Sequence, residues 1–202
     1  MEILLVLIVL AAGLYVLKQR EQQRRIALLG RYLGTYQIER QMEQLLDGYL
    51  RWLGENDPER RRQIRGILSG VEQSLAQQFA RFAADVQRME APLAQVSRLP
   101  LWLPFAQPLL PARRLFDVRR VFAVHARGIE AVAANAAQLD PKAQAYMMSA
   151  ELLLMQHTCH WFCRSKAVAS ARLLVRHQTP YVQVLDSVSR ATRADYLALV
   201  GR

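Results

Sequence analysis

The chain of 202 residues has little of what defines several protein classes. Two cysteines are too few for a disulfide scaffold, and nine glycines with eight prolines exclude collagen-like and low-complexity sequence. Acidic residues are also scarce, at 17 against 27 lysines and arginines, so the formal net charge is +10. A hydrophobic content of 52% nevertheless excludes a disordered tail. We therefore expect one domain, with or without an appendage, that is large enough to bury a core.

The first segment of the chain has no charged residue from Ile3 to Leu17, where it reads ILLVLIVLAAGLYVL. As a helix from Met1 to Leu17 it would be about 25 Å long, close to the short limit for crossing a bilayer. All positive charges follow this run, whereas a secretory signal carries them in front. The positive-inside rule then places residues 18–202 on the cytoplasmic side of a bacterial-type inner membrane, with the amino terminus on the other side. We predict a transmembrane anchor over residues 1–20.

Two alternatives for this segment stay open. A signal peptide cleaved after Ala11 would leave the apolar residues Leu14–Leu17 at the start of the mature chain. The segment could also be a buried first helix of a soluble protein, although a run of about 10–14 apolar residues would suit that role better.

Residues 21–202 show the apolar spacing of helices almost throughout and no alternating period of two, so we expect no sheet. Asp57-Pro58 and Asp140-Pro141 each combine a capping carboxylate with a proline that needs no N–H in the first helical turn. Short turns between long helices imply antiparallel neighbours. We predict an all-α fold, with a single N-terminal transmembrane helix followed by an antiparallel bundle of four to five long helices. The expected helices of the bundle cover about 36–53, 58–90, 112–139, 141 to before 180, and 181–199.

An apolar loop interrupts this helical pattern at residues 99–111, which read LPLWLPFAQPLLP. Proline at this density excludes regular helix and strand. If helix covers 18–53 and 58–90, the chain runs about 54 Å away from the bilayer and about 50 Å back, so the loop returns to the bilayer surface. The alternatives are a loop that caps the bundle and a docking site for another protein. The predicted membrane-interface residues are Tyr15, Lys18, Arg20, Arg98, Trp102, Phe105, Arg113 and Arg114.

One cluster contains residue types that bind metals. Residues 156–163 read QHTCHWFC, and a helix would place both cysteines and both histidines on one side. Thiolate, imidazole and thioether groups suit Cu or Zn, but the spacing matches neither a zinc motif nor the haem-attachment motif. The alternative is two buried thiols beside hydrogen-bonded histidines. We predict no cofactor, with Cu, Zn or haem as the alternative. The candidate ligands are His157, Cys159, His160, Cys163 and, from a neighbouring helix, His125.

The sequence contains no Gly-rich phosphate loop, nucleophile elbow, paired-histidine zinc helix or dinucleotide fingerprint. Three isolated acids are expected to face solvent or to form ion pairs. A group of arginines lies among acidic residues, which indicates a solvated surface rather than a nucleic-acid site. The acids are Asp117, Glu130 and Glu151, and the arginines are Arg60, Arg61, Arg62 and Arg65.

These observations favour a non-enzymatic accessory, scaffold or assembly protein that binds membrane lipids and other inner-membrane proteins, or a second copy of itself. We do not expect a nucleic-acid partner. The alternatives are a metal- or haem-handling factor and a peripheral module that binds anionic lipids.

Overall fold

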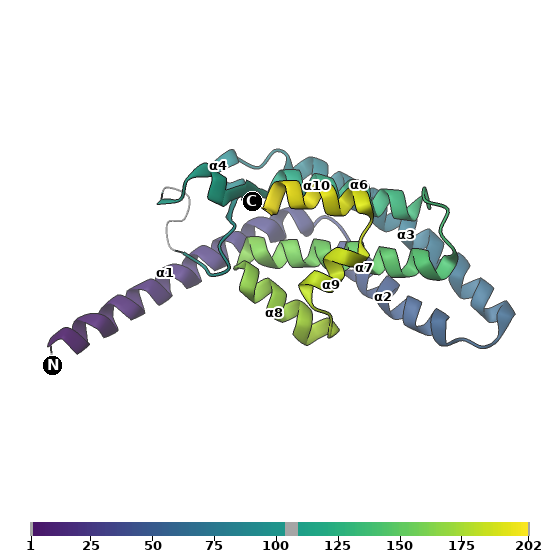
Figure 1. Ribbon diagram of the computed structural model, residues 1–202, viewed down its shortest axis with the longest axis horizontal. Coiled ribbons are helices and arrows are strands. Elements are labelled where there is room, and N and C mark those ends of the chain that lie inside the picture. The colour runs from purple at the N-terminus through teal and green to yellow at the C-terminus, as the bar shows by residue number, and fades with distance from the viewer. Residues whose placement is uncertain (1, 104–108, 202) are drawn as a thin grey trace.

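The computed structural model describes residues 2–103 and 109–201, which form helices and one short pair of strands (Figure 1). The elements are α1 (Glu2–Leu33), α2 (Ile38–Gly54), α3 (Pro58–Val86), α4 (Ala91–Ala94), β1 (Gln95–Ser97), η1 (Ala112–Arg114), β2 (Leu115–Asp117), α6 (Val118–Ala133), α7 (Pro141–Cys163), α8 (Lys166–His177), α9 (Tyr181–Ser187) and α10 (Arg190–Val200). The predicted all-α bundle is confirmed.

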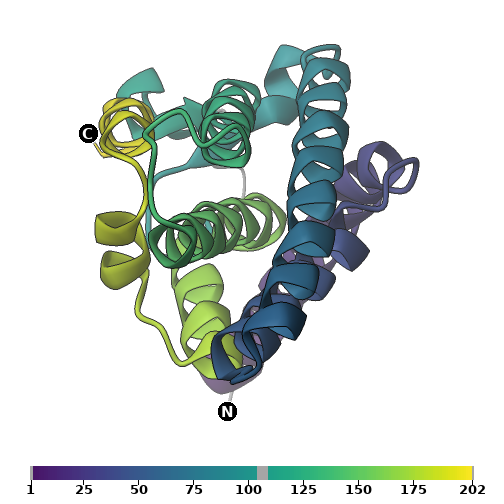
Figure 2. The same cartoon turned by 90° about the vertical axis from the view of Figure 1, so that its right-hand side faces the viewer.

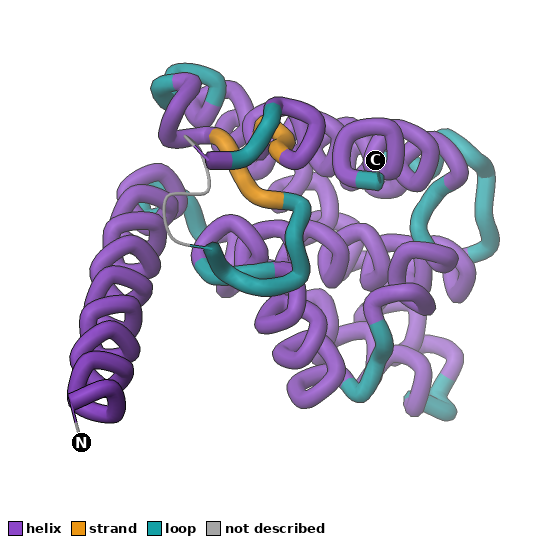
Figure 3. The backbone as a smooth tube through the Cα atoms, turned by 60° about the vertical axis from the view of Figure 1, so that its left-hand side comes forward, coloured by secondary structure: helices purple, strands orange, loops and turns teal. Residues whose placement is uncertain are grey.

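Helix α1 has two halves with different surroundings. Its first half extends away from the rest of the molecule (Figures 1 and 3), and its most apolar stretch is entirely unburied. Its second half packs on the body, where Gln22 and Leu29 are buried. The helix is long and apolar enough to span a membrane. Because none of this apolar stretch is buried, a first helix buried in the core of this chain is excluded.

The body is an antiparallel arrangement of α2, α3, α6 and α7, in which α3 contacts both α2 and α6, and α7 contacts α6 (Figures 1 and 2). Aromatic rings fill the contact between α3 and α6. The ring of Phe82 lies 5.3 Å from Phe79 and 5.1 Å from Phe122, measured between centroids. All three side chains are fully buried, so this apolar contact is a centre of the core.

The two predicted helix starts are confirmed. The side chain of Asp57 accepts a hydrogen bond from the backbone N–H of Glu59, and Asp140 accepts from the N–H groups of Lys142 and Ala143. In each helix a proline follows the capping aspartate. Since the N–H at this first helical position has no partner within the helix, proline causes no loss of a hydrogen bond.

The expectation of no sheet was wrong at one place. β1 and β2 pair antiparallel, with Val96 opposite Phe116 (Figure 3). The predicted helix over 112–139 therefore begins only at Val118, where the Asp117 side chain accepts from the N–H of Arg119. The helix ends at Ala133, and Asn135 and Gln138 adopt positive φ angles of 48° and 51°, which do not continue a right-handed helix.

The last two predicted helices are each divided in two. Ser165 caps α8 by accepting from the N–H of Val168, and Ser189 caps α10 by accepting from that of Thr192. A turn at residues 34–37 also separates α1 from α2, and α3 ends four residues earlier than predicted. Serine is a strong N-cap residue, so the starts of α8 and α10 have local causes that apolar spacing does not reveal.

Candidate functional site

Arg25 fixes the point at which α1 leaves the body. Its guanidinium donates to the carbonyl oxygens of Phe162 at 3.1 Å and Gln95 at 3.3 Å, and it pairs with Glu21 at 3.3 Å. Nearby, Arg164 donates to the side-chain oxygen of Gln22 at 3.0 Å. These contacts join α1 to the ends of α7 and β1 immediately after the apolar segment, so the direction of α1 relative to the body is held by polar contacts. No local pattern in the sequence indicates these contacts.

The proline-rich loop returns to this same point. The indole N–H of Trp102 donates to the carboxylate of Glu21 at 3.1 Å. Glu21 follows Leu17 by four residues, or about 6 Å along a helix. The loop therefore contacts α1 shortly after the apolar segment, and its predicted return to a bilayer surface stays a prediction. The turn at 34–37 makes the helices that lead to the loop shorter than expected. Leu101 beside Trp102 is 69% exposed.

The predicted interface residues fall into three groups. Tyr15, Arg20, Arg113 and Arg114 are exposed, and Lys18 is half-buried. Two others have structural partners that were not predicted. Arg98 donates to the carbonyl oxygens of Arg113 and Leu199, and Trp102 is half-buried against α1 as described above. Phe105 lies outside the described residues.

The five candidate metal ligands do not form one site. The His125 ring contacts the Thr158 hydroxyl at 2.8 Å, and the His157 ring contacts Ser170 at 3.0 Å. Cys159, His160 and Cys163 line a groove that neither of those rings lines. Within the described ranges, no three His, Cys, Asp or Glu side chains are grouped closely enough to hold a metal ion. Positions 157 and 159 are about 160° apart around the helix axis, at the two edges of the predicted face, and neighbouring helices pack against each edge separately.

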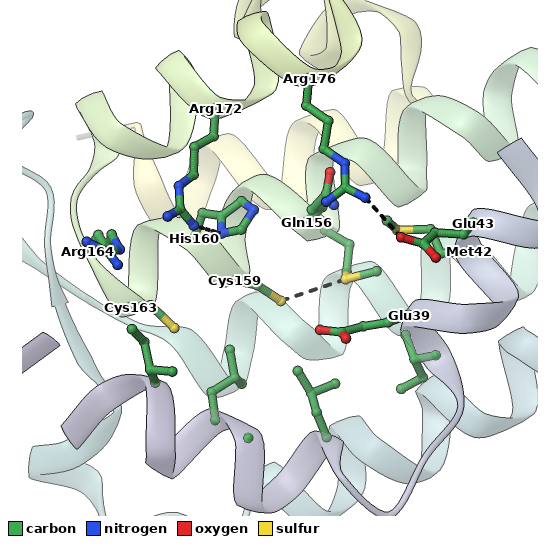
Figure 4. A pocket seen from close by; sticks show the side chains of 16 residues that line it. Glu39, Met42, Glu43, Gln156, Cys159, His160, Cys163, Arg164, Arg172 and Arg176 are labelled. Carbon is green, nitrogen blue, oxygen red and sulfur yellow. Dashed lines mark hydrogen bonds and ion pairs between the residues drawn. The ribbon is translucent and has the colours of Figure 1, made fainter. Parts of the chain in front are cut away.

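That groove lies between α1, α2, α7 and α8 and has a volume of about 350 Å³ (Figure 4). Ile26, Leu29 and Leu33 line it from α1, and Met155 and Cys159 line it from α7. The Cys159 thiol contacts the Met155 sulfur at 3.8 Å. Burial raises the pKa of Cys163 to about 11, so this thiol is uncharged near neutral pH.

Glu151 corrects another expectation, because this acid is fully buried rather than facing solvent or forming an ion pair. One of its oxygens accepts from the N–H of Ser189 at 3.1 Å, and burial raises the pKa of its carboxyl group. Gly128 lies against the carboxylate and against Thr192, with no room for a side chain. This polar contact joins α6, α7 and α10.

The arginines at the start of α3 have separate partners. Arg65 forms an ion pair at 2.8 Å with Glu72, which is fully buried, and donates to Gln144 at 2.7 Å. Arg61 lies over the ring of Trp52, 5.0 Å from its centroid. Arg60 and Arg62 pair at the surface with Glu55 and Glu59, in line with the mixed-charge surface that the sequence predicted, whereas Arg65 reaches into the core.

Comparison of the chain with protein-family models, with curated proteins and with solved structures finds no match.

Proposed function

We propose that this chain is a membrane-anchored helical scaffold: α1 spans a bacterial-type inner membrane once, and the body binds other membrane proteins on the cytoplasmic side without catalysing a reaction. The observation that carries the proposal is the exposure of α1. Its side chains from Ile3 to Leu10 are 56–79% exposed although all are apolar. Exposing this apolar surface to water is unfavourable in free energy, whereas the hydrocarbon core of a bilayer can surround it without that cost.

The contacts at the base of α1 support the same arrangement. A transmembrane helix joined by a flexible linker would leave the body free to move away from the bilayer. Here α1 continues into the body without a break, and Arg25 and Trp102 hold it there through hydrogen bonds. The body therefore stays beside the membrane, with exposed Arg20, Arg113 and Arg114 available to anionic headgroups.

Partner binding is proposed at the turn between α8 and α9. Leu174, Val175 and Val182 lie on either side of this turn and are 51%, 81% and 64% exposed. Apolar side chains grouped on a surface are typical of protein contacts. An exposed apolar helix and exposed apolar side chains on the body thus support the two parts of the scaffold proposal, the anchor and the contact surface.

Membrane extraction at alkaline pH tests the anchor. The full chain should stay in the membrane pellet with residues 1–17 retained in its intact mass, which a cleaved signal would not allow. Ile8→Arg should release it, because arginine at the centre of a transmembrane helix costs about 2.5–3.5 kcal/mol. Ile8→Leu is the matched control. Release of the unmodified chain, or full retention of Ile8→Arg, would contradict the anchor.

Site-specific photo-cross-linking in cells tests the scaffold role. A cross-linker at Val175 should capture a membrane protein, while one at Leu50, which is 71% exposed near the carboxyl end of α2, should not. If neither position cross-links to a membrane protein, the chain has no stable partner at this surface and the scaffold role is wrong.

Trp102→Phe tests how the loop is held. Phenylalanine keeps the ring but cannot donate to Glu21, so we expect faster proteolysis of residues 99–103 in the membrane-bound protein. Leu101→Ala removes an exposed neighbour and serves as control. Equal cleavage rates for Trp102→Phe and the unmodified chain would mean that the hydrogen bond does not hold the loop.

A further inference from the structure

The groove between α1, α2, α7 and α8 has two ends of different character. Arg164, His160 and Arg172 surround one end, and Glu39, Glu43 and Arg176 surround the other (Figure 4). The residues between them are mainly apolar. A volume of about 350 Å³ lies at the lower end of the range for small-molecule sites, which is roughly 300–1,000 Å³. The groove can therefore hold one narrow apolar group with a polar end.

The two arginines at the first end have no acidic partner within ion-pair distance among the described residues. Arg164 donates one N–H to Gln22, while its Nε–H is buried without an acceptor. Arg172 donates to Nδ1 of His160 at 3.2 Å. Both guanidinium groups line this end of the groove, so an anion held there would meet two positive charges that pair with no described carboxylate.

His160 adds no charge at this end of the groove. Burial, together with the neighbouring Arg172, Arg176 and Arg164, lowers its pKa to about 4, so the ring is neutral at pH 7. At the other end the charges are already balanced in part, because Arg176 pairs with Glu43 at 2.9 Å. Glu39 adds a negative charge there. An anion is therefore attracted to the Arg164–Arg172 end and repelled from the opposite one.

We propose that this groove binds a long-chain fatty acid, with its carboxylate at Arg164 and Arg172 and its hydrocarbon chain lying along α1 between Leu29 and Met155. A single chain matches the volume better than a two-chain phospholipid does. Arginine binds carboxylates through paired N–H groups, and the methionine and leucine side chains offer an apolar wall. The inference is independent of the proposed scaffold role, although Gln22 places the carboxylate end close to the carboxyl end of the apolar segment.

The test uses the full chain in nanodiscs of zwitterionic lipid, with oleate as probe and the amount bound corrected for empty nanodiscs. Oleate should bind in equal amount to protein at saturation, and oleyl alcohol should bind at least about tenfold more weakly because it lacks the charge. Arg172→Gln should weaken oleate binding by roughly tenfold for the same reason.

Two glycine variants distinguish oleate bound in the groove from oleate dissolved in the lipid of the nanodisc. A Cβ at Gly30 meets nothing within 4 Å, so Gly30→Leu fits the helix, and its side chain occupies space in the groove that Gly30 lines. This variant should abolish oleate binding. Gly66→Leu makes the same change at an exposed site of α3 and should leave binding unchanged. Circular dichroism of both variants verifies that each is folded.

Three results would overturn the proposal: no oleate bound above the empty nanodisc, equal binding of oleate and oleyl alcohol, or full binding by Gly30→Leu. Each of these leaves the alkaline extraction of the anchor unaffected. Failure of the groove and failure of the anchor are thus distinguishable.

Discussion

Acid should destabilise the body through His125 and His157. Both rings are buried, the first against Thr158 and the second against Ser170, with the His157 ring stacked on Tyr181 at 4.4 Å between centroids. Burial lowers the pKa of each to about 3, from an ordinary value of 6.5. Protonation of either ring would place a charge among apolar neighbours without an acidic partner.

The expected size of this destabilisation follows from proton linkage. Between pH 6.5 and 3 the unfolded chain binds a proton at each histidine and the folded chain does not, so stability is present above the unfolded pKa and is lost as the pH falls. Where the unfolded chain binds one proton more than the folded chain, the free energy of unfolding falls by about 1.4 kcal/mol per pH unit. For two histidines the fall is about 2.8 kcal/mol per unit at pH values well between the two pKa values. A body of this size is stable by only about 5–15 kcal/mol, so about two pH units remove a large part of its stability.

Urea unfolding of the full chain in a neutral detergent, followed by tryptophan fluorescence, measures this slope. The double variant His125→Gln and His157→Gln should lower the slope of unfolding free energy against pH by about 2–3 kcal/mol per unit between about pH 6 and pH 4. The raised pKa of Glu151 acts in the opposite sense, since its neutral form stabilises the fold at low pH. That contribution and those of His160 and His177 are common to both proteins. Equal slopes for the double variant and the unmodified chain would refute the assignment of this acid sensitivity to His125 and His157.

Two further predictions concern the core. Gly128→Ala should destabilise the body by about 1–3 kcal/mol because its methyl group meets the Glu151 carboxylate and Thr192, whereas Gly66→Ala on an exposed helical turn should stabilise it by up to about 1 kcal/mol. Urea unfolding of the two variants checks this, and equal midpoints would contradict the close contact. Arg65→Gln should cost about 3–5 kcal/mol by leaving the buried Glu72 carboxylate without its ion pair. Arg62→Gln, which breaks an exposed pair, should cost less than about 1 kcal/mol in the same assay, and similar losses for both would contradict the difference in burial.

Local chemistry was enough to predict the outline of the fold. The Asp-Pro pairs at 57–58 and 140–141 cap helices through atoms within three residues of each other, so distant neighbours have little influence. The apolar segment from Ile3 to Leu17 was evident for the same reason. Ser165 and Ser189 carried equally local cap signals, and long apolar periodicity hid them. Sequence therefore predicted the helical content better than the helix ends.

The candidate site depended on contacts between distant parts of the chain. β1 and β2 have three residues each, and their pairing joins segments about twenty residues apart, which no local period indicates. The helical spacing of His157, Cys159 and Cys163 suggested one site, but only the positions of α1, α8 and α9 decided that the thiols line a groove while the ring of His157 packs against Tyr181.

By itself the sequence determined an apolar amino-terminal helix, a helical body and two capped helix starts, because each follows from neighbours along the chain. Only the tertiary structure decided that Glu21 meets Trp102, that Glu72 and Glu151 are buried, and that Arg164 and Arg172 form no ion pair with any described residue beside an apolar groove. The physical reason is that burial and charge balance are properties of the residues packed around a group, and these come from elements far apart in the sequence.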